Sequence, residues 1–392
     1  MAFGLSVPNK ASAIILAAGL SSRMGRLKPL LPLGTGTVLG QCIAVLKQAG
    51  VSDILVVAGH RSEEVAAEVC VHGARPVHNP DFLEGMYSSI VAGVRMLDPN
   101  LATVLLLPVD IPLIRVGTVL LLQEAMQARG AQVAHPVFAG ERGHPLCIRA
   151  TLLRQLTQGE KGQAGLRPLL ANHEQKHPKQ VCEVRVADAN ILVDLDTPEA
   201  YKQGCERFGH RDYPAPEEAE VIVRYIHPMP AKGIVHGRLV GELAALFATA
   251  INRQQESGLN VELCRTCGLL HDLAKGQPHH EATGGLWLTR LGFPKAAAIV
   301  AAHKDLDWQT GGAITERELV HLADKLARGG YLLSIDRRFT EKKILYAHDA
   351  EAQAAIRDRH ALARRLAQAV EEESGQELSA LCRPLAHLQL PC

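Results

Sequence analysis

The feature that most constrains the fold is a change of hydrophobic period near the middle of the chain. Up to about residue 207, short apolar runs of period two alternate with stretches of period 3.6. Beyond that point strand-like runs nearly vanish and the helical period remains. The first pattern is typical of a mostly parallel α/β sheet covered by helices on both faces, and the second of an all-α bundle.

A segment rich in Gly, Pro and acidic residues separates the two patterns and is typical of a linker. We expect domains at residues 1–207 and 226–392, joined by a linker at 208–225. The expected strands are Ala13–Ala17, Ile54–Ala58, Ala74–His78, Thr103–Leu107 and Gln132–Val137. The expected helices are Val38–Ala49, Glu63–Val69, Met86–Leu97, Val116–Arg129, Leu239–Asn252, Val261–Ala274, Glu281–Leu291, Lys295–Ala302, Glu318–Arg328 and Ala350–Glu373.

Composition excludes several classes of protein. Hydrophobic residues make up 47% and charged residues 21% of 392, as in soluble globular proteins. A net charge of +1 gives no electrostatic reason for general nucleic-acid or membrane binding. No apolar run is expected to cross a bilayer. Nine scattered cysteines favour reduced thiols and the cytoplasm, and we assign the Cys264–Cys267 pair to the helical core.

The segment after the first expected strand is rich in glycine and positive charge. Gly19 and Gly25 allow close approach of an anion, and Arg23 and Lys28 offer the charge that a triphosphate needs. A loop between a strand and a helix can also direct backbone N–H groups at phosphates. The predicted NTP-binding residues are Leu16, Ala17, Ala18, Gly19, Ser21, Ser22, Arg23, Gly25 and Lys28.

This loop resembles that of nucleotidyltransferases which activate sugars, alcohols or cofactors, and most nearly that of the molybdenum cofactor cytidylyltransferases. The resemblance spans about residues 12–203 and implies a Rossmann-like fold. It also includes segments Asn79–Pro80, Glu84–Ile90, Pro108–Pro112, Arg142–Pro145 and Asp194–Glu199.

Nucleotidyl transfer depends on alignment and charge neutralisation, so Mg²⁺ and carboxylates are expected. Asp110, at a strand's carboxyl end, is the leading metal ligand and a catalytic residue with Arg23 and Lys28. The resemblance implies Asp196 as the second ligand, with Asp194 as the alternative. Asp196 could instead cap the following helix. Ser88 and Ser89 are expected near the acceptor's phosphate, although N-capping explains them almost as well, and His144 receives no role.

The second half contains His271 and Asp272 inside an apolar helical pattern, with Lys275 next. A buried, unpaired cluster of this kind is costly, which favours metal or anion partners. Further candidates in or beside expected helices are His236, His280, His303 and Asp324.

The order of these residues resembles the HD phosphohydrolase superfamily over about residues 228–336. The resemblance implies that His236, His271, Asp272 and Asp324 bind a divalent metal such as Mn²⁺ or Fe²⁺. It also implies that His280 and His303 hold a second ion bridged by Asp272. His271, Asp272 and Lys275 are the expected catalytic residues, with Lys275 expected to contact the substrate's phosphate.

The chain has 18 histidines, so the alternative is that these are ordinary core or surface histidines. His279 is an alternative to His280 as a ligand, and His227 and His321 stay unassigned.

The sequence therefore predicts an enzyme that transfers NMP from an NTP, with CTP favoured, to a phosphorylated acceptor such as molybdenum cofactor, and that also hydrolyses phosphate compounds. Tyr87 departs from the subgroup's small residue and leaves the acceptor open. The expected partners are the NTP, the acceptor and a molybdoenzyme; nucleic acid and membrane are not expected, and the oligomeric state is open. The alternatives are a regulatory HD module, or a first domain that delivers the cofactor without transfer.

Overall fold

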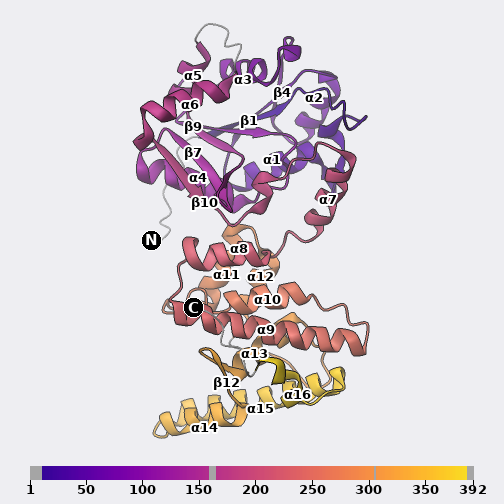
Figure 1. Cartoon of the computed structure of the whole chain (residues 1–392), viewed down its shortest axis with the longest axis vertical. Helices are drawn as coiled ribbons and strands as arrows, with labels where there is room; N and C mark the ends of the chain where they lie inside the picture. The colour runs from indigo at the N-terminus through magenta and orange to yellow at the C-terminus, as the bar shows by residue number, and fades with distance from the viewer. Residues whose placement is uncertain (1–10, 159–164, 304–305, 386–392) are drawn as a thin grey trace. The chain divides into compact units, whose positions relative to one another are not determined.

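The computed structural model describes residues 11–158, 165–303 and 306–385. These form two compact units, Met1–Arg211 and Asp212–Cys392. Figure 1 labels helices and strands of both units.

The first unit is built on one mostly parallel sheet. Its strands run in the order β10-β7-β9-β6-β1-β4-β5, with β8 paired to β7. The strands are β1 (Ala11–Ala17), β4 (Asp53–Ala58), β5 (Arg75–His78), β6 (Thr103–Pro108), β7 (Val133–Phe138), β8 (Glu141–Arg142), β9 (Leu146–Arg149) and β10 (Val181–Arg185), and a separate pair is formed by β2 (Pro32–Leu33) and β3 (Gly36–Thr37). The helices are α1 (Val38–Gln48), α2 (Ser62–Val71), α3 (Met86–Arg95), α4 (Val116–Arg129), α5 (Ala150–Gln158), α6 (Leu166–Lys176) and α7 (Pro198–Gly209).

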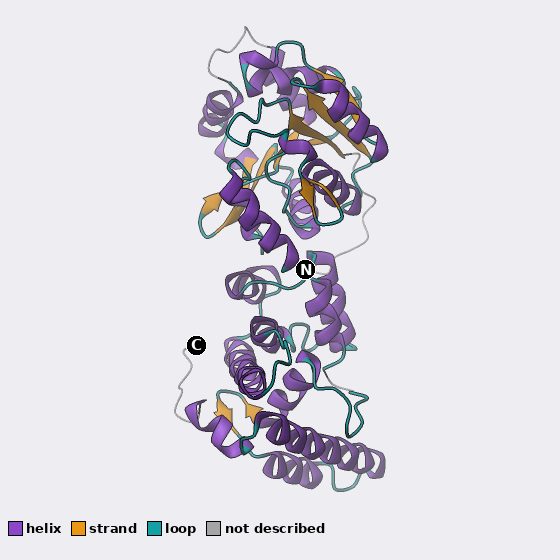
Figure 2. Ribbon diagram, turned by 90° about the vertical axis from the view of Figure 1, so that its right-hand side faces the viewer, coloured by secondary structure: helices purple, strands orange, loops and turns teal. Residues whose placement is uncertain are grey.

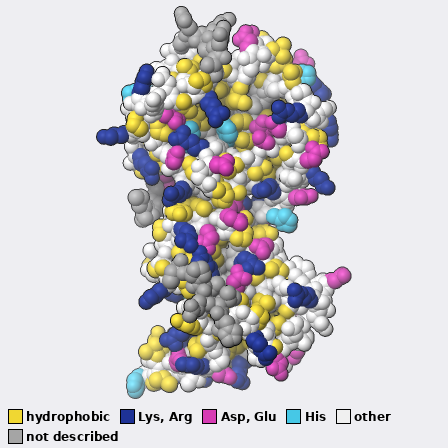
Figure 3. Space-filling view, viewed as in Figure 1, with side chains coloured by type: hydrophobic (Ala, Val, Ile, Leu, Met, Phe, Trp, Pro, Cys, Tyr) yellow, Lys and Arg dark blue, Asp and Glu magenta, His cyan; other side chains and the backbone are white. Residues whose placement is uncertain are grey.

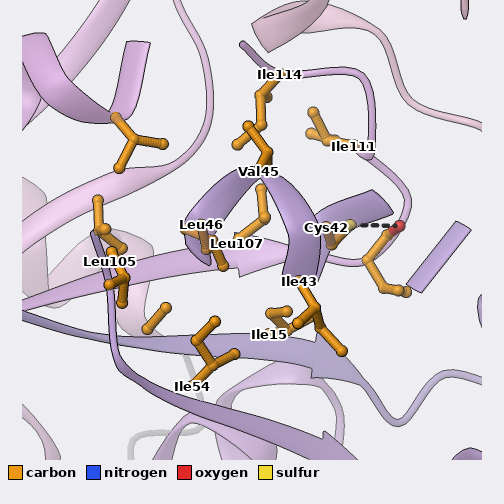
Figure 4. Packing of buried hydrophobic residues seen from close by; sticks show 14 of the residues in the cluster. Ile15, Cys42, Ile43, Val45, Leu46, Ile54, Leu105, Leu107, Ile111 and Ile114 are labelled. Atoms are coloured by element: carbon orange, nitrogen blue, oxygen red, sulfur yellow. Dashed lines mark hydrogen bonds between the residues drawn. The ribbon is translucent and has the colours of Figure 1, made fainter. Parts of the chain in front are cut away.

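Alternate residues of the central strand β1 belong to two separate cores. Ile15 packs with Ile43 and Leu46 of α1, in a cluster that Figure 4 shows from close by. Ile14 instead belongs to the core that includes Ile90 of α3. Because successive strand side chains point to opposite faces, both faces of the sheet are covered, and the expected mostly parallel α/β fold is confirmed.

Three strands of this sheet were missed from the sequence, the two-residue β8 and the longer β9 and β10. β9 is antiparallel to both β6 and β7, and β10 is parallel to β7. β9 is only four residues long and β10 alternates buried with exposed residues near polar sequence, so neither produced a long apolar run. Short strands depend on their neighbours more than on local pattern.

The second unit is almost entirely helical, with one short strand pair (Figure 2). Its helices are α8 (Pro216–Val221), α9 (Ala231–Gln254), α10 (Val261–Leu270), α11 (His280–Leu291), α12 (Pro294–Ala301), α13 (Glu316–Leu326), α14 (Ile335–Leu345), α15 (Ala350–Ser374) and α16 (Leu378–Cys382). The strands β11 (Ala327–Arg328) and β12 (Tyr331–Leu332) form an antiparallel hairpin that the all-α expectation did not include.

The expected linker is partly helical. Within residues 208–225, α8 begins at Pro216 and is followed directly by a wide helical turn over Ile222–Ile226. Pro at the first helical turn and the Glu218 side chain, which accepts from the Ala215 backbone N–H at 2.9 Å, stabilise the start of α8. The apparent break in pattern is therefore, in part, a helix start.

Helix α9 is long and apolar enough to cross a membrane by length and composition, contrary to the sequence expectation. However, 72% of its most apolar window is buried inside the structure, as in the central helix of a bundle. Cys264 and Cys267 of α10 are fully buried, which confirms that this pair belongs to the core.

Glycines allow α9 and α10 to pack closely, and this contact gives a testable prediction. A Cβ on Gly268 would overlap backbone atoms of Gly241, which cannot move aside like a flexible side chain. We expect Gly268→Ala to lower the free energy of unfolding of the second unit by about 1–3 kcal/mol in a denaturant titration. In the control Gly233→Ala, the new Cβ would meet two side-chain atoms, the Met229 Cε at 3.3 Å and the Pro230 Cδ at 3.9 Å, so little loss is expected. Equal stability of the two variants would contradict the packing described here.

Candidate active sites

The glycine-rich loop leaves the carboxyl end of β1. Ser21 and Gly25 adopt positive φ angles of 52° and 61°, a conformation that suits glycine and is uncommon for serine. The Ser21 Oγ accepts a hydrogen bond from the Lys28 backbone N–H at 3.1 Å, which closes the loop. A short 3₁₀ turn at Lys28–Leu30 follows. The helix expected at Val38–Ala49 is confirmed as α1, Val38–Gln48, and it follows the short strands β2 and β3.

The loop brings Lys28 against two carboxylates from distant parts of the chain. Its Nζ lies 2.5 Å from Asp196 Oδ1 and 3.4 Å from Asp110 Oδ2. Burial, together with the nearby Asp196, raises the pKa of Asp110 despite Lys28, whereas the hydrogen bond from Lys28 lowers the pKa of Asp196. The carboxylates of Asp110 and Asp196 lie close together, and Asp110 is partly desolvated. Their hard oxygens are suitable ligands for a divalent cation such as Mg²⁺.

The two alternatives for the second carboxylate have different surroundings. Asp194 is exposed, whereas Asp196 also receives an ion pair from Arg23 at 3.3 Å. The helix-capping role belongs to Thr197, whose hydroxyl accepts from the Ala200 N–H at 3.2 Å. The interpretation of Asp196 as an N-cap is therefore wrong.

Ser88 and Ser89 are held by a residue to which the sequence analysis gave no role. The buried Asn79 donates from Nδ2 to Ser88 Oγ at 2.9 Å and to Ser89 Oγ at 3.0 Å. Gly85 precedes α3 and no side chain caps this helix, so the N-capping interpretation of the serines is wrong. The only local signal for Asn79 was its place next to Pro80 in the resembling segment.

A cleft of about 2020 Å³ opens beside these serines. Leu16 and Pro108, at the carboxyl ends of β1 and β6, lie in its wall, while Lys28, Asp110 and Asp196 lie outside its lining. Its wall also includes His144, whose buried Nδ1 has no hydrogen-bond partner within the described residues and whose pKa is lowered by burial. Ligands of open α/β sheets bind at this edge.

In the second unit, side chains from several elements converge on one place. His236 comes from α9, Asp324 from α13, and His271 and Asp272 from the turn that follows α10. The expected helix thus ends at Leu270, before the two candidate ligands, instead of at Ala274. His236 Nε2 lies 3.3 Å and His271 Nε2 lies 3.7 Å from Asp324 Oδ1.

The same turn reaches a second group of side chains. Asp272 Oδ1 lies 3.6 Å from His280 Nε2 at the start of α11 and 3.8 Å from His303 Nε2 after α12. His279, the rival for this position, is exposed and lies outside the clusters found in the described chain. Asp272 is common to both groups, His236-His271-Asp272 and Asp272-His280-His303.

The protonation states of these groups fit divalent metal ions. His271 and His303 hold their Nδ1 against the backbone oxygens of Gly268 and Val300, both at 2.7 Å, which leaves each Nε2 facing the cluster. The His271 Nε2 is buried without a hydrogen-bond partner, and burial lowers its pKa to about 4, so the ring is neutral. The pKa of Asp324 stays well below its usual value: burial opposes this, but Lys325 and His236 more than offset it. Neutral imidazoles and ionised carboxylates are ligands for Mn²⁺, Fe²⁺ or Zn²⁺.

Basic side chains surround this cluster. Lys275 Nζ lies 2.5 Å from Asp272 Oδ2, and Lys325 Nζ lies 2.7 Å from Asp324 Oδ2. A pocket of about 220 Å³ opens over the carboxylates and is also lined by Arg338. Lys325 and Arg338 were not among the residues predicted from the sequence, although Lys325 directly follows an expected ligand.

The two unassigned histidines have different surroundings. His227 stacks on Trp287, with ring centres 4.1 Å apart and planes at 6°, and lies outside both metal-binding groups. His321 is fully buried, and its Nδ1 lies 2.7 Å from the backbone oxygen of His303. It therefore contacts the backbone of a candidate ligand.

The fold and the sites define a protein with an α/β nucleotide-transfer unit and a helical unit that bears a His/Asp centre. Comparison with known proteins agrees. Residues 13–178 match the MobA-like NTP transferase domain, and residues 233–329 match the HD domain. The chain belongs to the MobA-like NTP transferases and carries an HD domain.

Individual relatives cover about half of this chain. The molybdenum cofactor cytidylyltransferase of Escherichia coli K12 is 30% identical over 50% of this chain and 95% of its own. The molybdenum cofactor guanylyltransferase of Xanthomonas euvesicatoria is 30% identical over 49% of this chain and 93% of its own. The nicotine blue oxidoreductase of Paenarthrobacter nicotinovorans is also 30% identical, over 48% of this chain and 93% of its own. The first unit is thus a nucleotidyltransferase by family, while similarity at this level leaves the base and the acceptor open.

Proposed function

We propose that the first unit transfers CMP from CTP to a phosphorylated acceptor of the molybdenum-cofactor type, and that the HD unit hydrolyses phosphate compounds. The observation that carries the proposal is the meeting of Lys28, Asp110 and Asp196 beside the glycine-rich loop, at the edge where the large cleft opens. The preference for CTP rests on the resemblance of the Gly85–Ser89 segment to the cytidylyltransferases. Residues 1–207 and 226–392 would act as separate domains.

In the transfer step, a phosphate oxygen of the acceptor attacks the α-phosphorus of the NTP and pyrophosphate leaves. The loop from Leu16 to Lys28 would bind the triphosphate through its backbone N–H groups and through Arg23. Mg²⁺ held by Asp110 and Asp196 would neutralise the phosphoryl oxygens. Lys28 then adds positive charge next to the α-phosphate, and Asn79 fixes Ser88 and Ser89 for the acceptor.

In the HD unit, the described side chains set up hydrolysis. His236, His271, Asp272 and Asp324 would hold one metal ion, and His280 and His303 with Asp272 a second. Such ions activate water and stabilise phosphoryl oxygens. Lys275 and Lys325 keep positive charge beside the carboxylates and would bind the substrate's phosphate.

The direct test is pyrophosphate release from CTP, GTP or ATP with candidate acceptors, alongside hydrolysis of phosphate compounds with Mg²⁺, Mn²⁺ or Fe²⁺. Tight acceptor binding without pyrophosphate release would instead support a delivery protein. Metal-free protein with intact ligands and no hydrolysis would support a regulatory HD module. A thermal-shift screen of NTPs and metals reports which unit binds each ligand, because a ligand stabilises only the unit that recognises it.

We further propose that the protein acts in the cytoplasm. Each cysteine in the described part of the chain is a free thiol, as in reducing compartments. On the face shown in Figure 3, basic and acidic side chains are interspersed, which gives no support for nucleic acid as a partner. A molybdoenzyme partner would follow from the proposed acceptor.

A further inference from the structure

The pocket over the His/Asp centre is lined by an excess of positive charge. Five cationic side chains line it, Lys275, Lys325, Arg338, Lys342 and Arg359, against the carboxylates of Asp272 and Asp324 among the described lining residues. Both carboxylates already receive cations, since Asp272 pairs with Lys275 and Asp324 with Lys325 and Arg338. The lining histidines add no compensating negative charge.

Two of these cations come from helices beyond the part of the chain that matches the HD domain. Lys342 lies on α14 and Arg359 on α15, whereas the match ends at residue 329. Lys342 Nζ lies 5.8 Å from the ring centre of Phe339, a buried side chain that also lines the pocket. The pocket therefore has cations beside the metal-binding carboxylates and a further pair contributed by α14 and α15.

The size of the pocket limits what can occupy it. At about 220 Å³ it is smaller than the roughly 300–1,000 Å³ typical of sites that enclose a whole organic ligand. A compact, highly charged group fits this volume and charge better than a base or sugar does. Lys342 and Arg359 line the same pocket as the candidate metal ligands, so a ligand with a second phosphoryl group can contact both parts of the lining.

We propose that the HD site binds a phosphoanhydride, with one phosphoryl group at the His/Asp centre and the next one at Lys342 and Arg359. This inference rests on the proposed hydrolase function and names its substrate class. Nucleotidyl transfer itself yields two phosphoanhydrides, inorganic pyrophosphate and the nucleotide conjugate. The HD site would consume a product of that class of reaction.

Water is the only other reactant that the hydrolysis needs. A water oxygen bonds to the phosphorus at the His/Asp centre, and the bond from that phosphorus to the bridging oxygen breaks. The electron pair of that bond stays on the departing phosphate, whose new charge Lys342 and Arg359 would stabilise. The water proton passes to the leaving phosphate or to solvent, and no atom changes oxidation state.

The test compares diphosphate with monophosphate ligands on the full-length chain in Mn²⁺. Binding of methylenediphosphonate, which cannot be hydrolysed at its bridge, and of inorganic phosphate is measured by calorimetry for the wild type and for Lys342→Met and Arg359→Met. We expect each variant to lose about tenfold in diphosphonate affinity at the HD site, because one charge-assisted contact is removed, and less than about twofold in phosphate affinity. The NTP site is identical in all proteins, so differences between them report on the HD site.

The matched control is Arg337→Met, on the same helix as Lys342 but outside the pocket lining and paired with Glu341 at 3.2 Å. It should bind both ligands like the wild type. Equal losses for phosphate and diphosphonate, or no loss for either, would overturn the phosphoanhydride site.

A second experiment measures hydrolysis of pyrophosphate, of a nucleotide conjugate and of AMP. It distinguishes the two phosphoanhydrides from each other and from a phosphate monoester. Absence of all turnover would refute the hydrolase, whereas turnover of AMP alone, with no turnover of either anhydride, would refute only this inference.

Discussion

An Asp110→Asn protein is expected to release pyrophosphate from its NTP about 10²–10³-fold more slowly than the wild type. Asn keeps the shape of the side chain but removes the charge that, with Asp196, is proposed to bind Mg²⁺. It also removes one of the two carboxylates next to Lys28 Nζ. The measurement is the initial rate of pyrophosphate release at saturating NTP and acceptor, as a function of Mg²⁺ concentration.

Asp194→Asn is the matched control for this change. Asp194 is two residues from Asp196 and exposed. Its variant should keep the wild-type rate to within about twofold, as expected for a surface substitution outside the site. If Asp194→Asn were as inactive as Asp110→Asn, the assignment of Asp196 would be wrong. If Asp110→Asn remained active, the proposed location of the transferase site would be wrong.

An Asp272→Asn protein is expected to lose metal binding and hydrolysis in the HD unit, with activity reduced about 10³-fold. Asp272 belongs to both groups of candidate ligands, so its loss weakens either ion. Metal content after dialysis against Mn²⁺ and the rate of hydrolysis are measured together. The control is His279→Ala, because His279 neighbours a proposed ligand but is exposed.

The two aspartates also test whether the sites are independent. Asp272→Asn should leave pyrophosphate release by the transferase unchanged, and Asp110→Asn should leave hydrolysis unchanged. Their thermal unfolding should resemble that of the wild type apart from the metal-dependent part. If either substitution abolished both activities in a folded protein, a single shared site would explain the data better than two.

The sequence by itself determined the class of each unit and most of the residues that meet in the sites. The alternation of short strand-like runs with helical stretches predicted the α/β sheet, and strands such as β1 and β6 are indeed buried along their whole length. The His271–Asp272 pair stood out because charge within an apolar run is costly without a partner. These signals are local, so they can be recognised without knowledge of the tertiary contacts.

Only the tertiary structure decided what depends on contacts between distant segments. It placed Asp196 beside Lys28 and left Asp194 exposed, showed Asn79 holding both serines, and ended α10 before His271. It also placed Lys342 and Arg359 at the HD pocket, although no sequence pattern links them to it. The physical reason is that the apolar period sets which face of an element is buried, whereas the distance between two charged groups depends on how several elements pack.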